Sequence, residues 1–199
     1  MEQSGQDPEK KWNRRHRQAG GLGSPARVLM ENLHLLPARG DALDLACGRG
    51  VNALLLAEAG LAVQAWDISR VAIDRLMEEA GARGLAIRAS VRDVTRRPPE
   101  PASFDVILVS HFLDRGIAPA FIDALRPGGL LFYQTFTRDA VSDSGPSSPG
   151  MRLGDNELLA LFRPLRLRVY REEGRLGDTG RGWRDRAMLV AEKASPACR

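Results

Sequence analysis

Short apolar runs alternate with stripes of helical spacing through the first two thirds of the chain. Four such runs predict buried strands of a parallel sheet, at residues 43–46, 61–67, 85–91 and 104–110. A short amphipathic helix is expected at residues 26–33, and another helix directly after the first strand. Residues 71–81 carry a clear helical stripe that ends at Gly81. This alternation indicates an α/β protein.

The pattern changes in the last third. Two helices and three strands are expected there, at residues 118–125 and 155–162 and at residues 130–135, 165–170 and 186–192, respectively. Residues 165–170 alternate with period two, which is typical of an edge strand with one wet face. The link at 171–185 is charged, rich in glycine and without a helical stripe. A helical crossover is therefore not expected, and the last strand should pair antiparallel.

A glycine turn joins the first strand to the following helix. Gly48 and Gly50 lie where an α/β sheet presents backbone N–H groups and a helix N-terminus to a nucleotide-like ligand. The stretch from Gly48 to Ala53 also matches G-x-G-x-x-A, a dinucleotide fingerprint that is weak by itself. Asp44 favours another ligand, because a carboxylate repels a pyrophosphate but accepts hydrogen bonds from an ammonium group. The turn therefore favours an adenosine that carries an amino acid.

Further residues match a known family. Asp67 ends the second strand, Asp93 follows the third, and Leu125-Arg-Pro-Gly-Gly-Leu-Leu131 precedes the fifth. Together with the glycine turn they resemble the class I S-adenosylmethionine-dependent methyltransferases, and most of all the small bacterial group related to the tellurite-resistance and thiopurine methyltransferases. This resemblance implies a Rossmann-like, mostly parallel seven-stranded sheet with helices on both faces and the last strand antiparallel. It also implies a domain at 19–193, an N-terminal arm or lid at 1–18 and a tail at 194–199.

The resemblance implies a site for S-adenosyl-L-methionine. Asp67 would take both ribose hydroxyls, while Asp93 and the backbone N–H of Val94 would meet the adenine. In the family a Trp-x-x-Arg element folds over the cofactor, which here gives Trp12 and Arg15, with Arg15 at the methionine carboxylate. The other expected cofactor residues are Ala46, which replaces the usual glycine, and Gly48, Gly50, Asn52, Ile68 and Ser110.

Each of these roles has a simpler alternative. Asp67 can cap the next helix, Asp93 can be a turn residue, and residues 10–17 can be a solvated basic arm. His111 follows the fourth strand and is the candidate catalytic base, because an unperturbed imidazole pKa of roughly 6.5 suits deprotonation of a thiol or hydroxyl. A cofactor or structural hydrogen bond is its alternative role.

Composition narrows the function. The 199 residues, 43% hydrophobic and 27% charged, suit one domain, and residues 1–9 are polar enough to be disordered. The net charge is +4, but arginines scattered along the chain are weak evidence for a nucleic-acid surface. Cys47 and Cys198 suffice for neither a disulfide framework nor a metal site. No targeting segment or apolar run of the ~20 residues that span a membrane is present, so a cytoplasmic protein is expected.

The expected reaction is direct in-line transfer of a methyl group to a small-molecule acceptor. Neither Asn/Asp-Pro-Pro-Tyr nor a Pro-Cys nucleophile occurs in the chain, which argues against adenine or glutamine amino groups and pyrimidine C5 as acceptors. Two alternatives stay open: an RNA methyltransferase that uses the basic N-terminal arm, and a non-catalytic domain that binds S-adenosylmethionine. The oligomeric state does not follow from the sequence.

Overall fold

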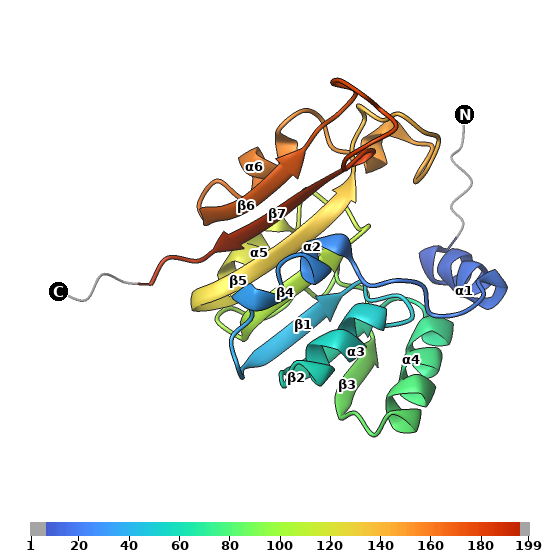
Figure 1. Ribbon diagram of the computed structural model, residues 1–199. Helices are drawn as coiled ribbons and strands as arrows, with labels where there is room; N and C mark the ends of the chain where they lie inside the picture. Colours follow the sequence, from blue (N-terminus) through green and yellow to red (C-terminus); the bar gives the residue numbers. More distant parts are fainter. Residues whose placement is uncertain (1–6, 196–199) are drawn as a thin grey trace.

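A seven-stranded sheet runs through the computed structural model, which describes residues 7–195 (Figure 1). The strand order is β3-β2-β1-β4-β5-β7-β6, with β7 antiparallel to both neighbours and the other pairs parallel. This confirms the expected Rossmann-like fold. The strands are β1 (Asp41–Leu45), β2 (Ala62–Asp67), β3 (Ile87–Val91), β4 (Phe104–Ser110), β5 (Leu125–Phe136), β6 (Arg166–Glu172) and β7 (Arg186–Glu192).

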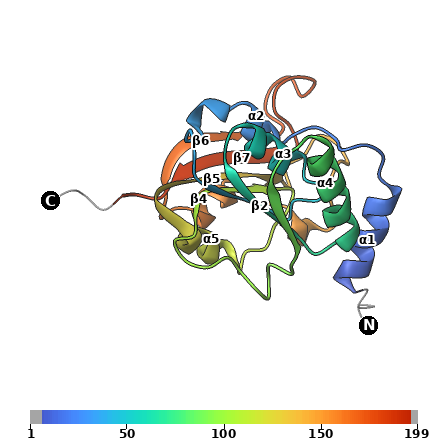
Figure 2. The ribbon, with the colours of Figure 1, turned by 90° about the horizontal axis from the view of Figure 1, so that it is seen from below.

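Helices cover both faces of the sheet (Figure 2). One face carries α2 (Arg27–Met30), α3 (Val51–Glu58) and α4 (Arg70–Ala82), and the other carries α5 (Ala118–Ala124) and α6 (Glu157–Leu161). Strand β4 shows why a continuous apolar run marks a central strand. Val106 and Leu108 pack into the core on the α3 face, while Ile107 and Val109 pack into the core on the α5 face.

Two boundaries differ from the sequence-based expectations by more than two residues. The helix expected at 26–33 ends at Met30, and a separate 3₁₀ turn, η1 (Leu33–Leu35), follows it. Buried Asn32 lies between them and donates its side-chain amide to the carbonyl of Val28, a local bond that competes with the helical pattern. Strand β5 begins at Leu125 instead of residue 130, because its pairing with β4 absorbs the Pro-Gly-Gly segment as an irregularity.

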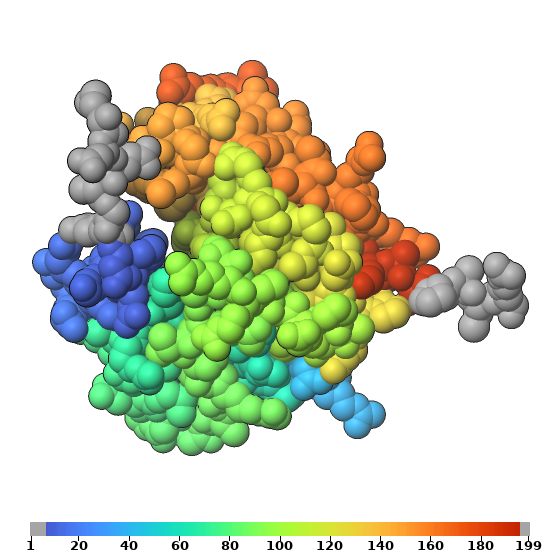
Figure 3. Space-filling model, turned by 180° about the vertical axis from the view of Figure 1, so that it is seen from behind, coloured from blue at the N-terminus to red at the C-terminus, as the bar shows by residue number. Residues whose placement is uncertain are grey.

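The N-terminal arm forms helix α1 (Pro8–Gln18), which packs against α4 (Figure 3). Disorder of residues 1–9 was the wrong expectation for residues 7–9, while residues 1–6 lie outside the described part of the chain. The Asp7 side chain caps the helix by accepting from the backbone N–H of Glu9, and Pro8 occupies the first helical position. No residue of α1 is fully buried, so the helix lies on the surface of the domain.

No helix in the described residues combines the length and the apolar character needed to cross a membrane. Strands β1 to β5 all run the same way, so their carboxyl ends meet at one edge of the sheet. The residues singled out from the sequence therefore gather along that edge.

Candidate functional site

Asp44 lies on β1 just before the glycine turn and is almost completely buried. Its Oδ2 accepts a hydrogen bond from the backbone N–H of Ala53 at 3.0 Å, while its Oδ1 has no partner among the described residues. Burial raises the pKa of Asp44 to about 8, and the nearby Asp67 carboxylate adds to this effect. A buried polar atom without a partner is costly, so Oδ1 is suited to accept a hydrogen bond from a ligand.

Asp67 at the end of β2 lies across the turn from Asp44. Its Oδ2 accepts from the backbone N–H of Gly48 and its Oδ1 from that of Ser69, both at 2.8 Å. Burial raises its pKa. The alternative role of Asp67 as the cap of α4 is wrong, because Ser69 is the N-cap residue and its hydroxyl accepts from the N–H of Ala72. Asp67 instead holds the two loops of the crevice together.

The glycine turn depends on left-handed backbone geometry. Gly48 has φ +54°, and a Cβ at this position would lie 3.4 Å from Cε1 of His16. Gly50 has φ +76°, and its Cβ would lie 2.3 Å from a methyl carbon of Leu76 on α4. Gly50 is therefore required for helix packing as well as for the turn. Ala46 also adopts a left-handed conformation, with φ 53°, which is strained for alanine and relaxed for the glycine usual in the family.

The side chain of Asn52 is already engaged within the protein. Its Oδ1 accepts from the backbone N–H of Ala26 at 2.7 Å, and the residue is buried. This bond ties the start of α3 to the segment before α2. A cofactor contact by this side chain would have to come from its amide nitrogen.

Asp93 follows β3 and forms a turn, which is the simpler alternative role expected for it. One oxygen accepts from both the backbone N–H and the hydroxyl of Thr95, at 3.0 and 2.7 Å, and these bonds lower the pKa of Asp93. The other oxygen lies 3.4 Å from Nε of Arg96. Val94 and Ile68, which are also expected to contact the cofactor, are buried and half-buried, respectively. A turn role and an adenine contact are compatible, since the second oxygen pairs with the exposed side chain of Arg96.

Helix α1 reaches the crevice through two residues. Asn13 accepts from the hydroxyl of Ser69 at 2.7 Å and from the backbone N–H of Val71 at 3.2 Å, at the N-terminus of α4. His16 lies beside Gly48 and close enough to Asp67 for their charges to interact. Burial lowers the pKa of His16, and Asp67 opposes this shift.

The two arm residues chosen from the sequence differ in how exposed they are. Trp12 is half-buried, whereas Arg15 is exposed and stacks its guanidinium on the Trp12 ring at 5.3 Å. The end of α1 is held by Arg49 and Arg75, which both donate to the carbonyl oxygen of Ala19, at 3.4 and 2.9 Å. Asn13 and His16, rather than Arg15, are thus the arm residues that contact the glycine turn and its surroundings. No sequence pattern pointed to Asn13, since its role depends on how α1 docks.

His111 follows β4 in a left-handed conformation with φ 58°. Its Nδ1 lies 3.2 Å from the hydroxyl of Ser110, and its Nε2 accepts from Nε of Arg186 at 3.1 Å, with the amide nitrogen of Gln134 at 3.5 Å. The ring packs against Phe136, 4.9 Å between centroids. Although the residue reaches solvent, partial burial and then the charge of Arg186 lower its pKa to about 4. The assumption of an unperturbed pKa is therefore wrong, and the neutral ring acts as an acceptor for Arg186.

Gln134 and Arg186 were not recognised from the sequence. Gln134 is buried on β5, and its side-chain Oε1 accepts from the backbone N–H of Val28 at 2.9 Å, which fixes α2 against the sheet. Arg186 begins β7 opposite Phe136. Only the antiparallel register of β5 and β7 brings it beside His111, and the sequence does not specify that register.

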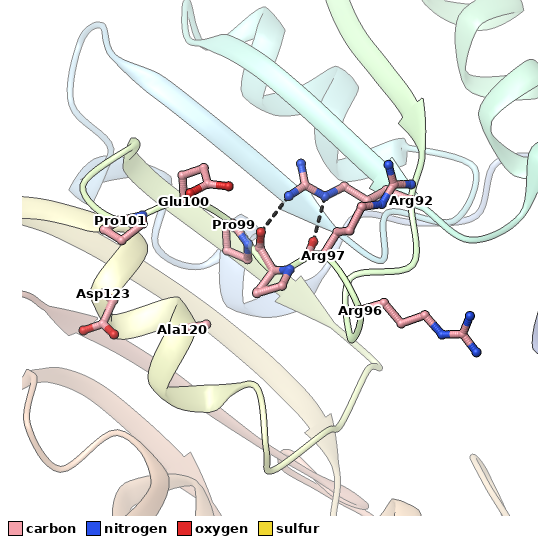
Figure 4. A pocket seen from close by; sticks show the side chains of 9 residues that line it. Arg92, Arg96, Arg97, Pro99, Glu100, Pro101, Ala120 and Asp123 are labelled. Atoms are coloured by element: carbon pink, nitrogen blue, oxygen red, sulfur yellow. Dashed lines mark hydrogen bonds between the residues drawn. The ribbon is translucent and has the colours of Figure 1, made fainter.

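A surface hollow of about 560 Å³ lies between the loop after β3 and helix α5 (Figure 4). Arg92 forms part of its wall, stacks on Trp66 at 3.8 Å and donates to the carbonyls of Arg97 and Pro98. None of the residues expected to bind the cofactor lines this hollow. Within residues 7–195, no group of three or more His, Cys, Asp or Glu side chains is placed to hold a metal ion. Cys47 is buried, and Cys198 lies outside the described residues.

Residues 42–129 match a protein family described as "Methyltransferase domain". This span contains the glycine turn, Asp67, Asp93 and His111. Among curated proteins, the Ubiquinone biosynthesis O-methyltransferase of Idiomarina loihiensis is 31% identical over 107 residues, or 50% of this chain and 44% of that protein. The chain thus spans less than half the length of this relative.

Solved structures share the fold over most of the chain. A structure described for the conversion of a disulfide bond into a thioacetal group during echinomycin biosynthesis has a TM-score of 0.71 at 22% identity. The matched region covers 96% of this chain and 94% of the chain in that structure. TehB from Haemophilus influenzae has a TM-score of 0.69 at 21% identity and covers 93% of this chain and 66% of its own.

Proposed function

We propose that this chain is a class I S-adenosylmethionine-dependent methyltransferase, which binds S-adenosylmethionine at the glycine turn and methylates a small-molecule acceptor. The observation that carries the proposal is the unpartnered Oδ1 of buried Asp44. An ammonium group donates a hydrogen bond to this oxygen and neutralises the charge of the carboxylate, whereas the carboxylate would repel the pyrophosphate of a dinucleotide. The residues around the turn therefore fit an amino-acid-bearing adenosine.

The chain's own residues divide the work of binding. Asp44 accepts from the ammonium group, and Asp67 orients the ribose while its bonds to Gly48 and Ser69 fix the carboxylate. Asp93 and the backbone of Val94 border the adenine. The cofactor supplies a methyl group that its sulfonium already activates. Catalysis by the protein is then chiefly positioning of the acceptor and exclusion of water, which the docked helix α1 assists.

Ser110 and His111 lie at the end of β4, next to the strand that carries Asp44. With a pKa of about 4, His111 is neutral at physiological pH and is a weak base whose Nε2 already accepts from Arg186. We therefore assign it an orienting role rather than proton abstraction. An acceptor that reaches the site already deprotonated needs no stronger base.

The test is release of S-adenosylhomocysteine with small thiols, phenols, amines and oxyanions, each measured with and without RNA. The proposal expects turnover on at least one small acceptor, with RNA making no difference, and loss of turnover in Asp44→Ala. Calorimetry with S-adenosylmethionine and NAD is the binding control. Tighter binding of NAD would contradict the proposal.

An RNA acceptor is the second candidate. Helix α1 exposes a basic surface made of Lys10, Lys11, Arg15 and Arg17, with Trp12 as its one aromatic residue. Turnover that requires RNA, together with binding that weakens steeply with salt, would favour this candidate over the small molecule. Cofactor binding without any transfer would favour the non-catalytic domain.

A further inference from the structure

Arg186 differs from the other half-buried arginines in what it bonds. Within residues 7–195 its Nε donates to a nitrogen, Nε2 of His111, and the neighbouring Asp185 acts on its charge without forming an ion pair with it. The other half-buried arginines all donate to oxygen atoms of carboxylates or backbone carbonyls: Arg49, Arg75, Arg92, Arg115, Arg126, Arg152, Arg171 and Arg184.

The guanidinium of Arg186 is held in place although it lacks an anion. It lies 4.6 Å from the ring centroid of Phe136 and 5.8 Å from that of Trp183. Partial burial lowers its pKa, which reflects the cost of a charge that water solvates incompletely. The indole Nε1 of Trp183 is itself buried without a hydrogen-bond partner in the described residues. This cluster thus holds unused donors and a positive charge that no ion pair neutralises in the described residues, although Asp185 lies near enough to act on it.

The position of Arg186 relates it to the acceptor rather than to the cofactor. It stands opposite Phe136 at the end of β5, beside His111 at the end of β4. The backbone of Asp44 on β1 lies three strands away in the order β1-β4-β5-β7, about 14 Å at ~4.8 Å per strand, and the Arg186 side chain spans part of this gap to reach His111 on β4. Between them lie the ends of β4 and β5, where an acceptor would face the methyl group.

We propose that Arg186 binds the carboxylate of the methyl acceptor, so that the substrate is a small anionic molecule. The identification of the bound anion as the methyl acceptor rests on the proposed function, whereas the anion site itself does not. Guanidinium groups bind carboxylates through two parallel hydrogen bonds, and the terminal nitrogens of Arg186 offer this geometry. His111 assists as a positioning residue, because its neutral Nε2 takes the Nε–H and leaves those terminal nitrogens for the ligand.

The test compares carboxylates with their amides. Ligand-observed NMR measures the binding of benzoate against benzamide and of acetate against acetamide, with and without S-adenosylhomocysteine. We expect the wild-type protein to prefer the carboxylates about 10-fold or more, as a charge-assisted pair implies. Arg186→Gln should abolish this preference, and Arg186→Lys should retain part of it. Arg168→Gln, on the edge strand β6 and paired with Glu192, is the matched control and should keep it.

Each outcome bears on the proposal. Equal binding of carboxylates and amides, or a preference that survives in Arg186→Gln with wild-type melting, overturns it. A fall in S-adenosylhomocysteine affinity in Arg186→Gln as large as the fall for benzoate would assign Arg186 to the cofactor carboxylate instead. If the wild-type protein fails to bind S-adenosylhomocysteine, the proposed function fails, while benzoate binding to the free protein still decides the role of Arg186.

Discussion

Binding of S-adenosylmethionine should release a proton near neutral pH. Burial holds the pKa of Asp44 at about 8 in the free protein, so most molecules carry the neutral acid at pH 7. An ammonium group beside Oδ1 favours the carboxylate. Binding therefore removes a proton from Asp44, and the ammonium group keeps its own.

The magnitude follows from this pKa. With Asp44 titrating at about 8, roughly 1% of it is ionised at pH 6 and roughly 10% at pH 7, so affinity should rise about tenfold between these values. Close to one proton should be released per cofactor bound in this range. An α-amino group titrates near ~7.7–8.0, so above pH 8 the ligand loses its charge and the gain should level off and reverse.

Calorimetry in buffers of different ionisation enthalpy counts the protons. The control ligand is 5′-methylthioadenosine, which keeps the adenine and ribose but has no ammonium group, and it should release markedly fewer protons. Asp67 also has a raised pKa, and the control ligand measures its contribution separately. Equal proton release with both ligands, or a pH-independent affinity between pH 6 and 7, would refute the assignment of Asp44 to the ammonium group.

Three further changes test other parts of the site. Asp67→Ala removes two contacts of roughly 1.5–3 kcal/mol each to the ribose and should weaken S-adenosylmethionine about 100-fold or more in titrations; unchanged affinity would mean that the ribose lies elsewhere. Deletion of residues 1–18 should weaken cofactor binding but lower the melting temperature of the free protein by only about 2–4 °C, since α1 buries no residue fully. Ala46→Gly removes a left-handed alanine that costs ~1–2 kcal/mol, but it also destabilises the folded state by ~0.4–1 kcal/mol because glycine makes the unfolded chain more flexible. The melting temperature should therefore rise slightly; a lower melting temperature would show that the methyl group of Ala46 makes stabilising contacts.

The sheet could be derived from the sequence because each strand leaves a local signal. The run in β4 is apolar on both faces, and β6 is the edge strand that its period-two sequence predicted. Burial along β6 does not alternate, and an irregularity between Leu167 and Val169 interrupts its pairing with β7. The extent of α2 could not be derived, because the bond from Asn32 to Val28 decides it. The start of α1 could have been derived, since Asp7 followed by Pro8 is an N-terminal signal in the sequence.

The candidate site divides in the same way. Asp44 and Asp67 could be chosen from the sequence because their positions follow from strand ends and one glycine turn. His16 and Arg186 could not, because each is brought to the site by a tertiary arrangement: the docking of α1 on α4 and the register of β7 on β5. The pKa of His111 was misjudged for the same reason, since the burial that chiefly lowers it and the charge of Arg186, 75 residues away in sequence, both arise from the tertiary fold.

The distance between the two charged parts of the site makes them separable by pH. The backbones of Asp44 and Arg186 lie about 14 Å apart, and the carboxylate whose charge acts on Arg186 is that of Asp185 rather than that of Asp44. Ionisation of Asp44 should therefore leave the carboxylate preference at Arg186 unchanged between pH 6 and 8, while cofactor affinity changes severalfold per pH unit over the same range. Benzoate titrations at pH 6, 7 and 8 in the absence of cofactor measure this directly. A carboxylate preference that falls as pH rises towards 8 would mean that Asp44 or Asp67 acts on the anion, and that the two parts form one pocket.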